Sequence, residues 1–153
     1  GIDFGRAVAD YKVPANQVSD PYMHLFRDAG KGKVLAFFEL PHSREMGRDA
    51  NTPDWVQNIA FKVGSVAELE EAKARLQAAG ITVVGITDHT IFKSIYFFDP
   101  NGLRLELAAD VGTRDIYAKL DACKWDMLEE WSKTKRAPQH AAWMHDREFA
   151  SKA

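Results

Sequence analysis

Apolar and polar positions alternate most clearly in the middle of the chain. In residues 57–63, Ile59, Phe61 and Val63 share one face, and asparagine, alanine and lysine occupy the other. This period of two predicts a strand with one buried side. Further apolar runs typical of strands follow at residues 81–87, 92–98 and 103–108.

A helix is predicted between the first and second of these strands. Ser65 and Glu68 form a capping box, in which each side chain can bind the other residue's backbone amide. Apolar residues then recur at spacings of three and four until Gly80, which favours a helix end. The helix is predicted over 66–79, and the order of elements is βαβββ. The apolar stripe consists of Val66, Leu69, Ala72, Leu76 and Ala79.

An earlier part of the chain repeats the last two strands and their turn. Residues 22–40 match the plan of residues 93–107, with Asp28 corresponding to Asp99 and Glu39 to Glu106. The turn at 99–102 reads Asp-Pro-Asn-Gly, which favours a hairpin. We therefore predict two tandem copies of one module. Residues 4–13 supply at most one further strand, so the first module looks incomplete at its N-terminus. Either the chain is a fragment, or a partner subunit supplies the missing strand.

Four segments are predicted along the chain. Residues 1–41 form a partial first module, the polar segment 42–55 a linker, and residues 56–110 the complete second module. Residues 111–153 form a helical extension whose apolar stripe should cover the sheet or a subunit interface. That stripe consists of Ile116, Leu120, Cys123, Met127 and Trp131.

Composition narrows the class of protein. The 153 residues are 46% apolar, and 20 basic residues nearly balance 22 acidic ones, for a net charge of −2. This favours a soluble globular protein whose partners are neither nucleic acid nor membrane. The single cysteine cannot form an intrachain disulfide, and the first residues lack a signal-peptide pattern, so we expect a cytoplasmic protein. No phosphate-loop, dinucleotide or nucleophile-elbow motif occurs.

The last predicted strand places Glu106 where a carboxylate is costly. Its leucines should face a helix, which puts Arg104 and Glu106 on the opposite face, together with Asn58 and the matching Glu39. A buried carboxylate needs a cation or hydrogen-bond donors, and a divalent ion would serve. The alternative is an ordinary contact of Glu106 with Arg104 or a lysine on a solvated face.

These residues resemble a known family. The stretch Asn58-Ile-Ala-Phe-Lys-Val, the helix, Gly80-Ile-Thr-Val and the run from Ser94 to Leu107 are similar to the second module of the vicinal oxygen chelate superfamily. That superfamily includes glyoxalase I, bleomycin-resistance proteins and extradiol dioxygenases. The resemblance implies an α+β fold, with paired βαβββ modules forming a curved, cup-like mixed sheet.

The resemblance also implies a divalent metal ion (Fe, Mn, Ni or Zn) held by the first and last strands of each module. Glu106 and Glu39 match the last-strand ligand positions. Asn58 stands where the family usually has histidine, and its amide oxygen is a weaker ligand for iron or zinc. His89 and Tyr96 fall where ring-cleaving relatives have active-site side chains, suited to proton transfer and to hydrogen bonding of oxygen.

Three hypotheses about the function follow from these residues. The first is a metal-dependent enzyme acting on a small oxygen-bearing molecule, with extradiol dioxygenase-like chemistry favoured over glyoxalase-like isomerisation. The second is a binding or resistance protein that has lost the metal and sequesters an aromatic molecule in a pocket lined by Phe37, Phe97 and Trp55. The third is a partner-dependent chain whose site forms only in an oligomer, and a homodimer is the expected assembly.

Overall fold

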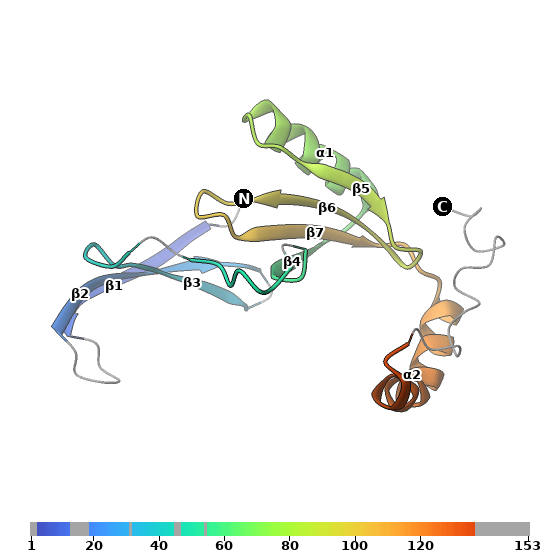
Figure 1. Cartoon of the computed structure of the whole chain (residues 1–153). Helices are drawn as coiled ribbons and strands as arrows, with labels where there is room; N and C mark the ends of the chain where they lie inside the picture. Colours follow the sequence, from blue (N-terminus) through green and yellow to red (C-terminus); the bar gives the residue numbers. More distant parts are fainter. Residues whose placement is uncertain (1–2, 13–18, 31, 45–46, 54, 137–153) are drawn as a thin grey trace. The chain divides into compact units, whose positions relative to one another are not determined.

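The computed structural model describes residues 3–12, 19–30, 32–44, 47–53 and 55–136, and the chain divides into two compact units, Gly1–Arg48 and Asp49–Ala153. Each unit contains its own sheet (Figure 1). The boundary between the units lies inside the segment 42–55 that was predicted as a linker. The last part of the predicted helical extension, 137–153, lies outside the described residues.

The first unit is an antiparallel sheet of three strands. β1 (Asp3–Lys12), β2 (Ser19–Asp28) and β3 (Val34–Glu39) follow one another in both chain order and sheet order. The structure confirms the strand expected over 4–13 as far as Lys12, and the hairpin expected over 22–40. Neighbouring strands pair with Leu25 opposite Phe37 and Met23 opposite Glu39.

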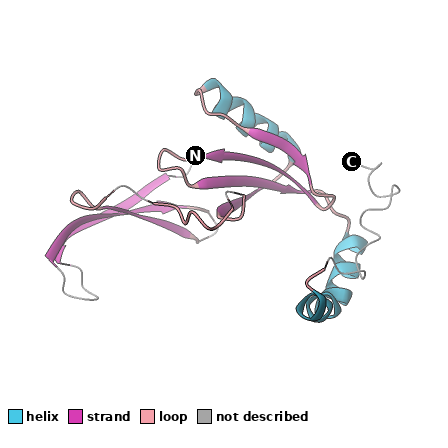
Figure 2. Ribbon diagram, in the orientation of Figure 1, coloured by secondary structure: helices cyan, strands magenta, loops and turns pink. Residues whose placement is uncertain are grey.

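The second unit contains the predicted βαβββ order. It runs β4 (Asn58–Val63), α1 (Val66–Ala78), β5 (Val84–Asp88), β6 (Phe92–Phe98) and β7 (Arg104–Asp110). The sheet order is β4-β7-β6-β5. Figure 2 shows strands and helices in different colours in the view of Figure 1. β4 pairs with β7 in parallel and the remaining pairs are antiparallel, which makes the sheet mixed, as predicted.

The two hairpin turns use the same side chain in the same way, which supports the predicted repeat. In the second unit, Asp99 Oδ1 accepts hydrogen bonds from the amides of Asn101 (2.9 Å) and Leu103 (2.8 Å). In the first unit, Asp28 Oδ1 accepts from the amide of Gly30 at 2.7 Å. An aspartate at the start of a turn therefore satisfies the backbone donors that the reversal leaves unpaired.

The ends of α1 explain one difference from the predicted strand boundaries. Ser65 Oγ accepts from the Glu68 amide at 3.2 Å, as the capping box requires, although Glu68 Oε2 reaches the Gly64 amide instead of that of Ser65. At the other end Gly80 has a φ of +77°, and the Ile81 amide donates to Leu76 O at 3.0 Å. Since Ile81 closes the helix, β5 begins at Val84 and not at residue 81.

The core of the second unit lies between α1 and one face of its sheet. Leu69 and Ala72 of α1 pack with Ile95 and Ala109, and Leu107 joins the edge of this cluster. Residues of alternate parity on β6 and β7 therefore face away from the helix, as predicted for Arg104 and Glu106. Phe97 pairs with Leu105 and so shares the helix-covered face, which contradicts its expected place in a ligand pocket.

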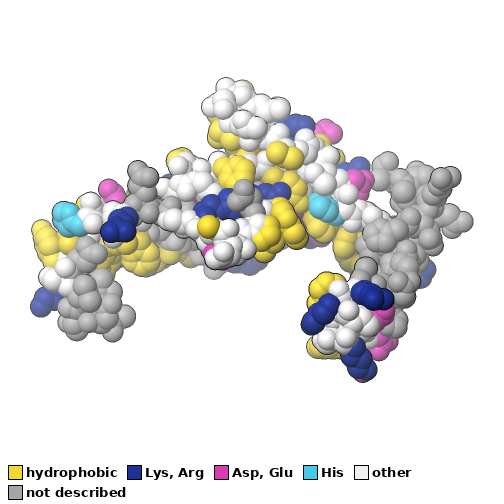
Figure 3. All heavy atoms as spheres, viewed as in Figure 1, with side chains coloured by type: hydrophobic (Ala, Val, Ile, Leu, Met, Phe, Trp, Pro, Cys, Tyr) yellow, Lys and Arg dark blue, Asp and Glu magenta, His cyan; other side chains and the backbone are white. Residues whose placement is uncertain are grey.

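The predicted C-terminal helix is α2 (Arg114–Thr134), which begins at the capping residue Thr113. Among its described residues only Ile116 is buried. Of the other stripe residues, Leu120, Cys123 and Met127 are half-buried, and Trp131 is 47% exposed. Figure 3 shows hydrophobic side chains at the surface of both units. Within the described residues, no helix has the length and apolar character needed to cross a membrane.

Gly85 should tolerate no larger side chain. Its φ is +106°, and a Cβ there would lie 2.6 Å from Ser94 O. Gly80 is the matched control, because its φ is +77° and a Cβ would meet nothing within 4 Å. We expect Gly85→Ala to lower the free energy of unfolding by about 3 kcal/mol, and Gly80→Ala by about 1 kcal/mol, in urea titrations. Equal losses of stability in the two variants would show that β6 moves to make room for the methyl group at position 85.

Candidate functional site

Glu106 is the buried carboxylate of the second unit. It lies in β7, between β4 and β6, on the face that α1 does not cover. The residue is 8% exposed, and neighbouring Ser94 is fully buried. A charged group at this depth must be stabilised by its partners, because desolvation otherwise favours its neutral form.

Two neutral side chains provide that stabilisation. Ser94 Oγ donates a hydrogen bond to Glu106 Oε1 at 2.5 Å, and Asn58 Nδ2 donates to Oε2 at 2.8 Å. The donors come from β6 and β4, the strands on either side of β7. Each oxygen of Glu106 therefore has a donor from a different strand, and the two hydrogen bonds hold the carboxylate in one orientation.

Arg104 does not form the ion pair with Glu106 that was the sequence-based alternative. Its guanidinium lies 4.0 Å from the centre of the Tyr96 ring, and Nη1 donates to Trp55 O at 2.7 Å. Within the part of the chain that the structure describes, no lysine or arginine forms an ion pair with Glu106. The solvated-face reading of Glu106 is therefore wrong.

His89 and Tyr96 form a hydrogen-bonded pair. His89 Nε2 lies 2.8 Å from the Tyr96 hydroxyl, and the imidazole stacks on the Phe92 ring with centroids 4.6 Å apart. The turn that carries His89 is fixed by Asp88, whose Oδ1 accepts from the Thr90 amide at 2.7 Å. Thr90 has a φ of +73°, a conformation that costs a residue with a Cβ about 1 kcal/mol.

The register of β6 and β7 places the His89–Tyr96 pair beside the Glu106 carboxylate. Tyr96 is the direct cross-strand partner of Glu106, so their side chains leave the same face side by side. Burial raises the pKa of the Tyr96 phenol above its ordinary value, and the nearby Glu106 charge raises it further. The Ser94 hydroxyl and Arg104 act in the opposite direction. The phenol consequently remains protonated at neutral pH and can donate its proton in a hydrogen bond.

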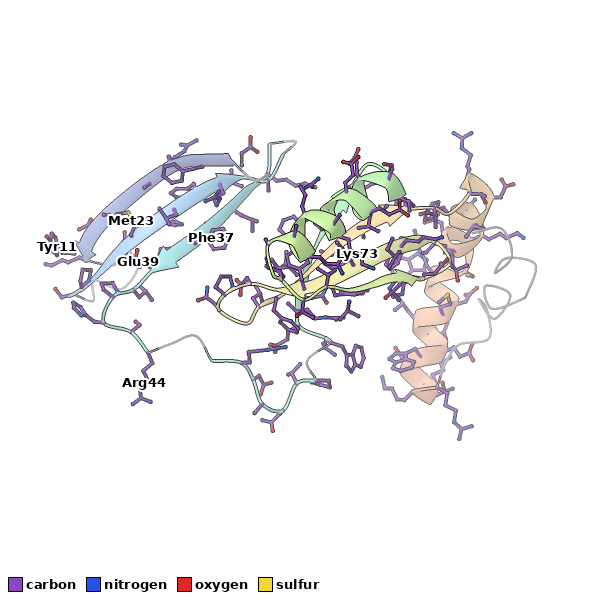
Figure 4. All side chains as sticks on the ribbon, turned by 90° about the horizontal axis from the view of Figure 1, so that it is seen from above. Tyr11, Met23, Phe37, Glu39, Arg44 and Lys73 are labelled. Atoms are coloured by element: carbon purple, nitrogen blue, oxygen red, sulfur yellow. The ribbon has the colours of Figure 1, made fainter. Side chains whose placement is uncertain are left out.

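The predicted metal ligands are only partly together. Glu106 and Asn58 are in contact, whereas Glu39 belongs to the first unit and is exposed. There it lies beside a hollow of about 330 Å³ that Tyr11 and Met23 also line (Figure 4). Among the described residues, no three His, Cys, Asp or Glu side chains are grouped so that they could hold an ion.

The chemistry of the donors decides whether a metal ion fits beside Glu106. The carboxylate is one anionic oxygen ligand, and rotating the Asn58 amide would present its oxygen instead of its nitrogen. Two oxygen donors suit a divalent cation that prefers oxygen, although they are fewer than a complete site needs. Residues outside this pair would have to supply the other ligands.

Sequence reasoning missed two contributors to this site. Ser94 is two residues before Tyr96 on the same strand, so the period of two already places it on the Glu106 face. Arg104 was considered only as a partner of Glu106. Its position over the Tyr96 ring depends on cross-strand packing, which the pattern of residue types does not specify.

Comparisons with known proteins agree with this architecture. Residues 4–107 match the family described as Glyoxalase/Bleomycin resistance protein/Dioxygenase superfamily. The chain is 28% identical over 83 residues to MhqA of Bacillus subtilis (strain 168), described as a candidate ring-cleaving dioxygenase. That match covers 54% of this chain and 26% of MhqA, so the chain spans about a quarter of that relative.

Two solved structures share the fold. The glyoxalase family protein from Bacillus cereus superposes with a TM-score of 0.57 at 16% identity, covering 73% of this chain and 80% of that one. The trypanothione-dependent glyoxalase I of Leishmania major gives a TM-score of 0.51 at 19% identity, covering 86% and 81%. At these identities the likeness concerns the arrangement of strands and helices.

The raised pKa of Tyr96 should be visible in a titration of the phenol absorbance. The difference between the wild type and Tyr96→Phe isolates this residue, and we expect its ionisation above the ordinary value of about 10. Glu106→Gln removes a nearby negative charge and should lower this pKa, while Glu70→Gln on the exposed side of α1 should not.

The raised pKa of Tyr96 also determines whether the free energy of unfolding rises or falls with pH. The unfolded chain releases the phenol proton at a lower pH than the folded chain, so this contribution to stability is complete below about pH 10 and is lost as the pH rises further. The wild type should therefore lose stability more steeply than Tyr96→Phe in alkaline urea titrations. Parallel curves would contradict the assignment.

Proposed function

The chain belongs to the Glyoxalase/Bleomycin resistance protein/Dioxygenase superfamily, and we propose that within it this protein is a divalent-metal-dependent enzyme of the vicinal oxygen chelate type. Its substrate would be a small oxygen-bearing molecule bound at the face that carries Glu106. The observation that carries this proposal is the juxtaposition of a buried carboxylate with the His89–Tyr96 pair on one side of one sheet.

Glu106 would anchor the ion, and Asn58 would add a neutral oxygen. When bound, the ion would supply Lewis acidity, drawing together two adjacent oxygens of the substrate and stabilising the negative charge that develops on them. Glu39 is proposed as a further ligand because it occupies the repeat position of Glu106. Ser94 holds Oε1 of Glu106, and rotation of the Asn58 amide would release Oε2 for the ion.

His89 and Tyr96 would move a proton. In the His89 tautomer whose Nε2 is an acceptor, the Tyr96 hydroxyl would donate to Nε2, and the phenol oxygen would accept a hydrogen bond from a substrate hydroxyl. A proton leaving the substrate would reach Tyr96, while the Tyr96 proton passes to His89. Arg104 over the Tyr96 ring limits the motion of that ring and so keeps the phenol directed at His89.

Ring cleavage of an aromatic diol is favoured over isomerisation for two reasons. A diol must lose protons as it reacts, and the His89–Tyr96 pair is an acceptor of suitable type beside the carboxylate. The second reason is the similarity to MhqA. Glyoxalase-type isomerisation would instead use a carboxylate base such as Glu39.

A second function is supported by one specific observation. Ser94 and Asn58 already satisfy both oxygens of Glu106, so the carboxylate is stable in this fold without a cation. A protein that keeps the fold but needs no metal could sequester a small aromatic molecule on the same face. Metal binding separates the two functions.

Metal titration tests the leading proposal. Protein purified without a metal-chelating column and stripped with a chelator should bind about one ion per chain of Fe(II), Mn(II), Ni(II) or Zn(II) in calorimetric titrations. Glu106→Gln should abolish this binding, whereas Glu70→Gln should retain it. Failure of all four ions to bind would reject the enzyme and favour sequestration.

Kinetics tests the role of His89. In metal-loaded protein given a panel of catechols, oxygen uptake should show that His89→Gln lowers kcat by about 10²- to 10⁴-fold with little change in metal stoichiometry. His42→Gln is the matched control, because His42 is an exposed histidine of the first unit. Equal rates for the two variants would remove His89 from the mechanism.

A further inference from the structure

Arg104 places a cation on the face of the second sheet that carries Glu106. The two residues are separated by one position on β7, so their side chains leave the same face with Cα atoms about 7 Å apart. The guanidinium carbon of Arg104 lies 4.0 Å from the centre of the Tyr96 ring. The positive charge is therefore next to the phenol that takes part in the proposed reaction.

Within the described ranges, no carboxylate forms an ion pair with Arg104. Ion pairs there are formed by Lys62, Arg75, Lys93, Lys124 and Lys133. Glu106 does not neutralise the guanidinium, because its two oxygens are bound by Ser94 and Asn58. Arg104 is half-buried, so an anion that reaches it gains from its charge as well as from hydrogen bonding.

The contacts of Arg104 hold its guanidinium in place. Nη1 donates to Trp55 O at 2.7 Å, and the flat group packs over the Tyr96 ring. A guanidinium has several N–H donors in one plane, and the bond to Trp55 engages one of its nitrogens. A fork that is already oriented loses little side-chain entropy on binding, and its planar geometry matches the two oxygens of a carboxylate.

The spacing of Arg104 and Glu106 suits a single aromatic ring. In the proposed function, Glu106 holds the ion that binds two adjacent hydroxyl oxygens of the substrate. The separation of about 7 Å along β7 is close to the distance between a hydroxyl of an aromatic diol and a carboxylate on the far side of its ring. One ring can therefore present its oxygens to Glu106 and its carboxylate to Arg104.

We infer that Arg104 selects the substrate by binding a carboxylate, and that the substrate is an aromatic diol with this group on its ring. The inference rests on the proposed function, because the diol oxygens are bound through Glu106. It adds a role for Arg104 in direct contact with the substrate, besides its packing on Tyr96. The guanidinium would act in binding and would not exchange a proton, since its pKa is too high.

A pair of ligands that differ in charge tests this role. 3,4-dihydroxybenzoate and its neutral amide, 3,4-dihydroxybenzamide, have nearly the same shape. In calorimetric titrations of the metal-loaded full chain without oxygen, Arg104→Gln should raise the Kd of the carboxylate about 10- to 100-fold and leave that of the amide unchanged. Comparing variants cancels the difference in hydroxyl acidity between the ligands. A loss of affinity that is equal for both ligands, or no loss, would overturn the inference.

Two further variants separate charge, geometry and fold. Arg104→Lys should recover part of the affinity for the carboxylate, because it keeps the charge and loses the planar fork. Arg75→Gln is the matched control, since Arg75 is an exposed arginine of α1, which covers the opposite face of the sheet. It should bind both ligands like the wild type. Circular dichroism and metal stoichiometry should be the same for all variants.

Catechol distinguishes failure of this inference from failure of the proposed function, because it has both hydroxyls and no anionic group. If catechol and the amide bind while Arg104→Gln affects the carboxylate and the amide alike, the inference alone is wrong. If the protein takes up no ion, or if the metal-loaded protein binds none of the three diols, the proposed function fails and the inference fails with it.

Discussion

The burial of the Glu106 carboxylate is the constraint on which the second unit depends. Donors reach it from both neighbouring strands, Asn58 from β4 and Ser94 from β6. This is possible only because β7 lies between those strands in the sheet, although β4 is far from both in the chain. The sheet order that satisfies the carboxylate is therefore the same order that gives α1 a continuous apolar face on the opposite side.

The two faces of the second sheet have different roles. α1 and the residues beneath it form the apolar core, with Leu69 and Ile95 fully buried. The opposite face is polar, and its side chains are positioned by cross-strand contacts among Glu106, Tyr96 and Arg104. Because a strand directs successive side chains to opposite faces, a change in register by one residue would exchange core and site. The core packing thus holds the site in place.

Much of this arrangement was predictable from local signals. The Ser65 cap, the stripe of α1 and the Asp-Pro-Asn-Gly turn act within a few residues, so the pattern of residue types was sufficient. Alternation placed Asn58 and Glu106 on one face, whereas their hydrogen bond also depends on the pairing of β4 with β7. The position of Arg104 and the incomplete burial of the α2 stripe were not predictable, because both depend on which long-range contacts form. Glu39 was matched to Glu106 by repeat position, and the sequence did not show that it would be exposed.

The parallel pairing of β4 with β7 also has a kinetic consequence. Asn58 pairs with Arg104, so α1 and two strands must be made before β4 gains its only sheet partner among the described strands. The β6–β7 hairpin, closed by Asp99, needs only local contacts and should form first. β4 would then join by closing a long loop, which is slow because much chain entropy is lost before any contact compensates for it. Within the second unit, β7 would thus serve as the template for β4, although β4 is made earlier.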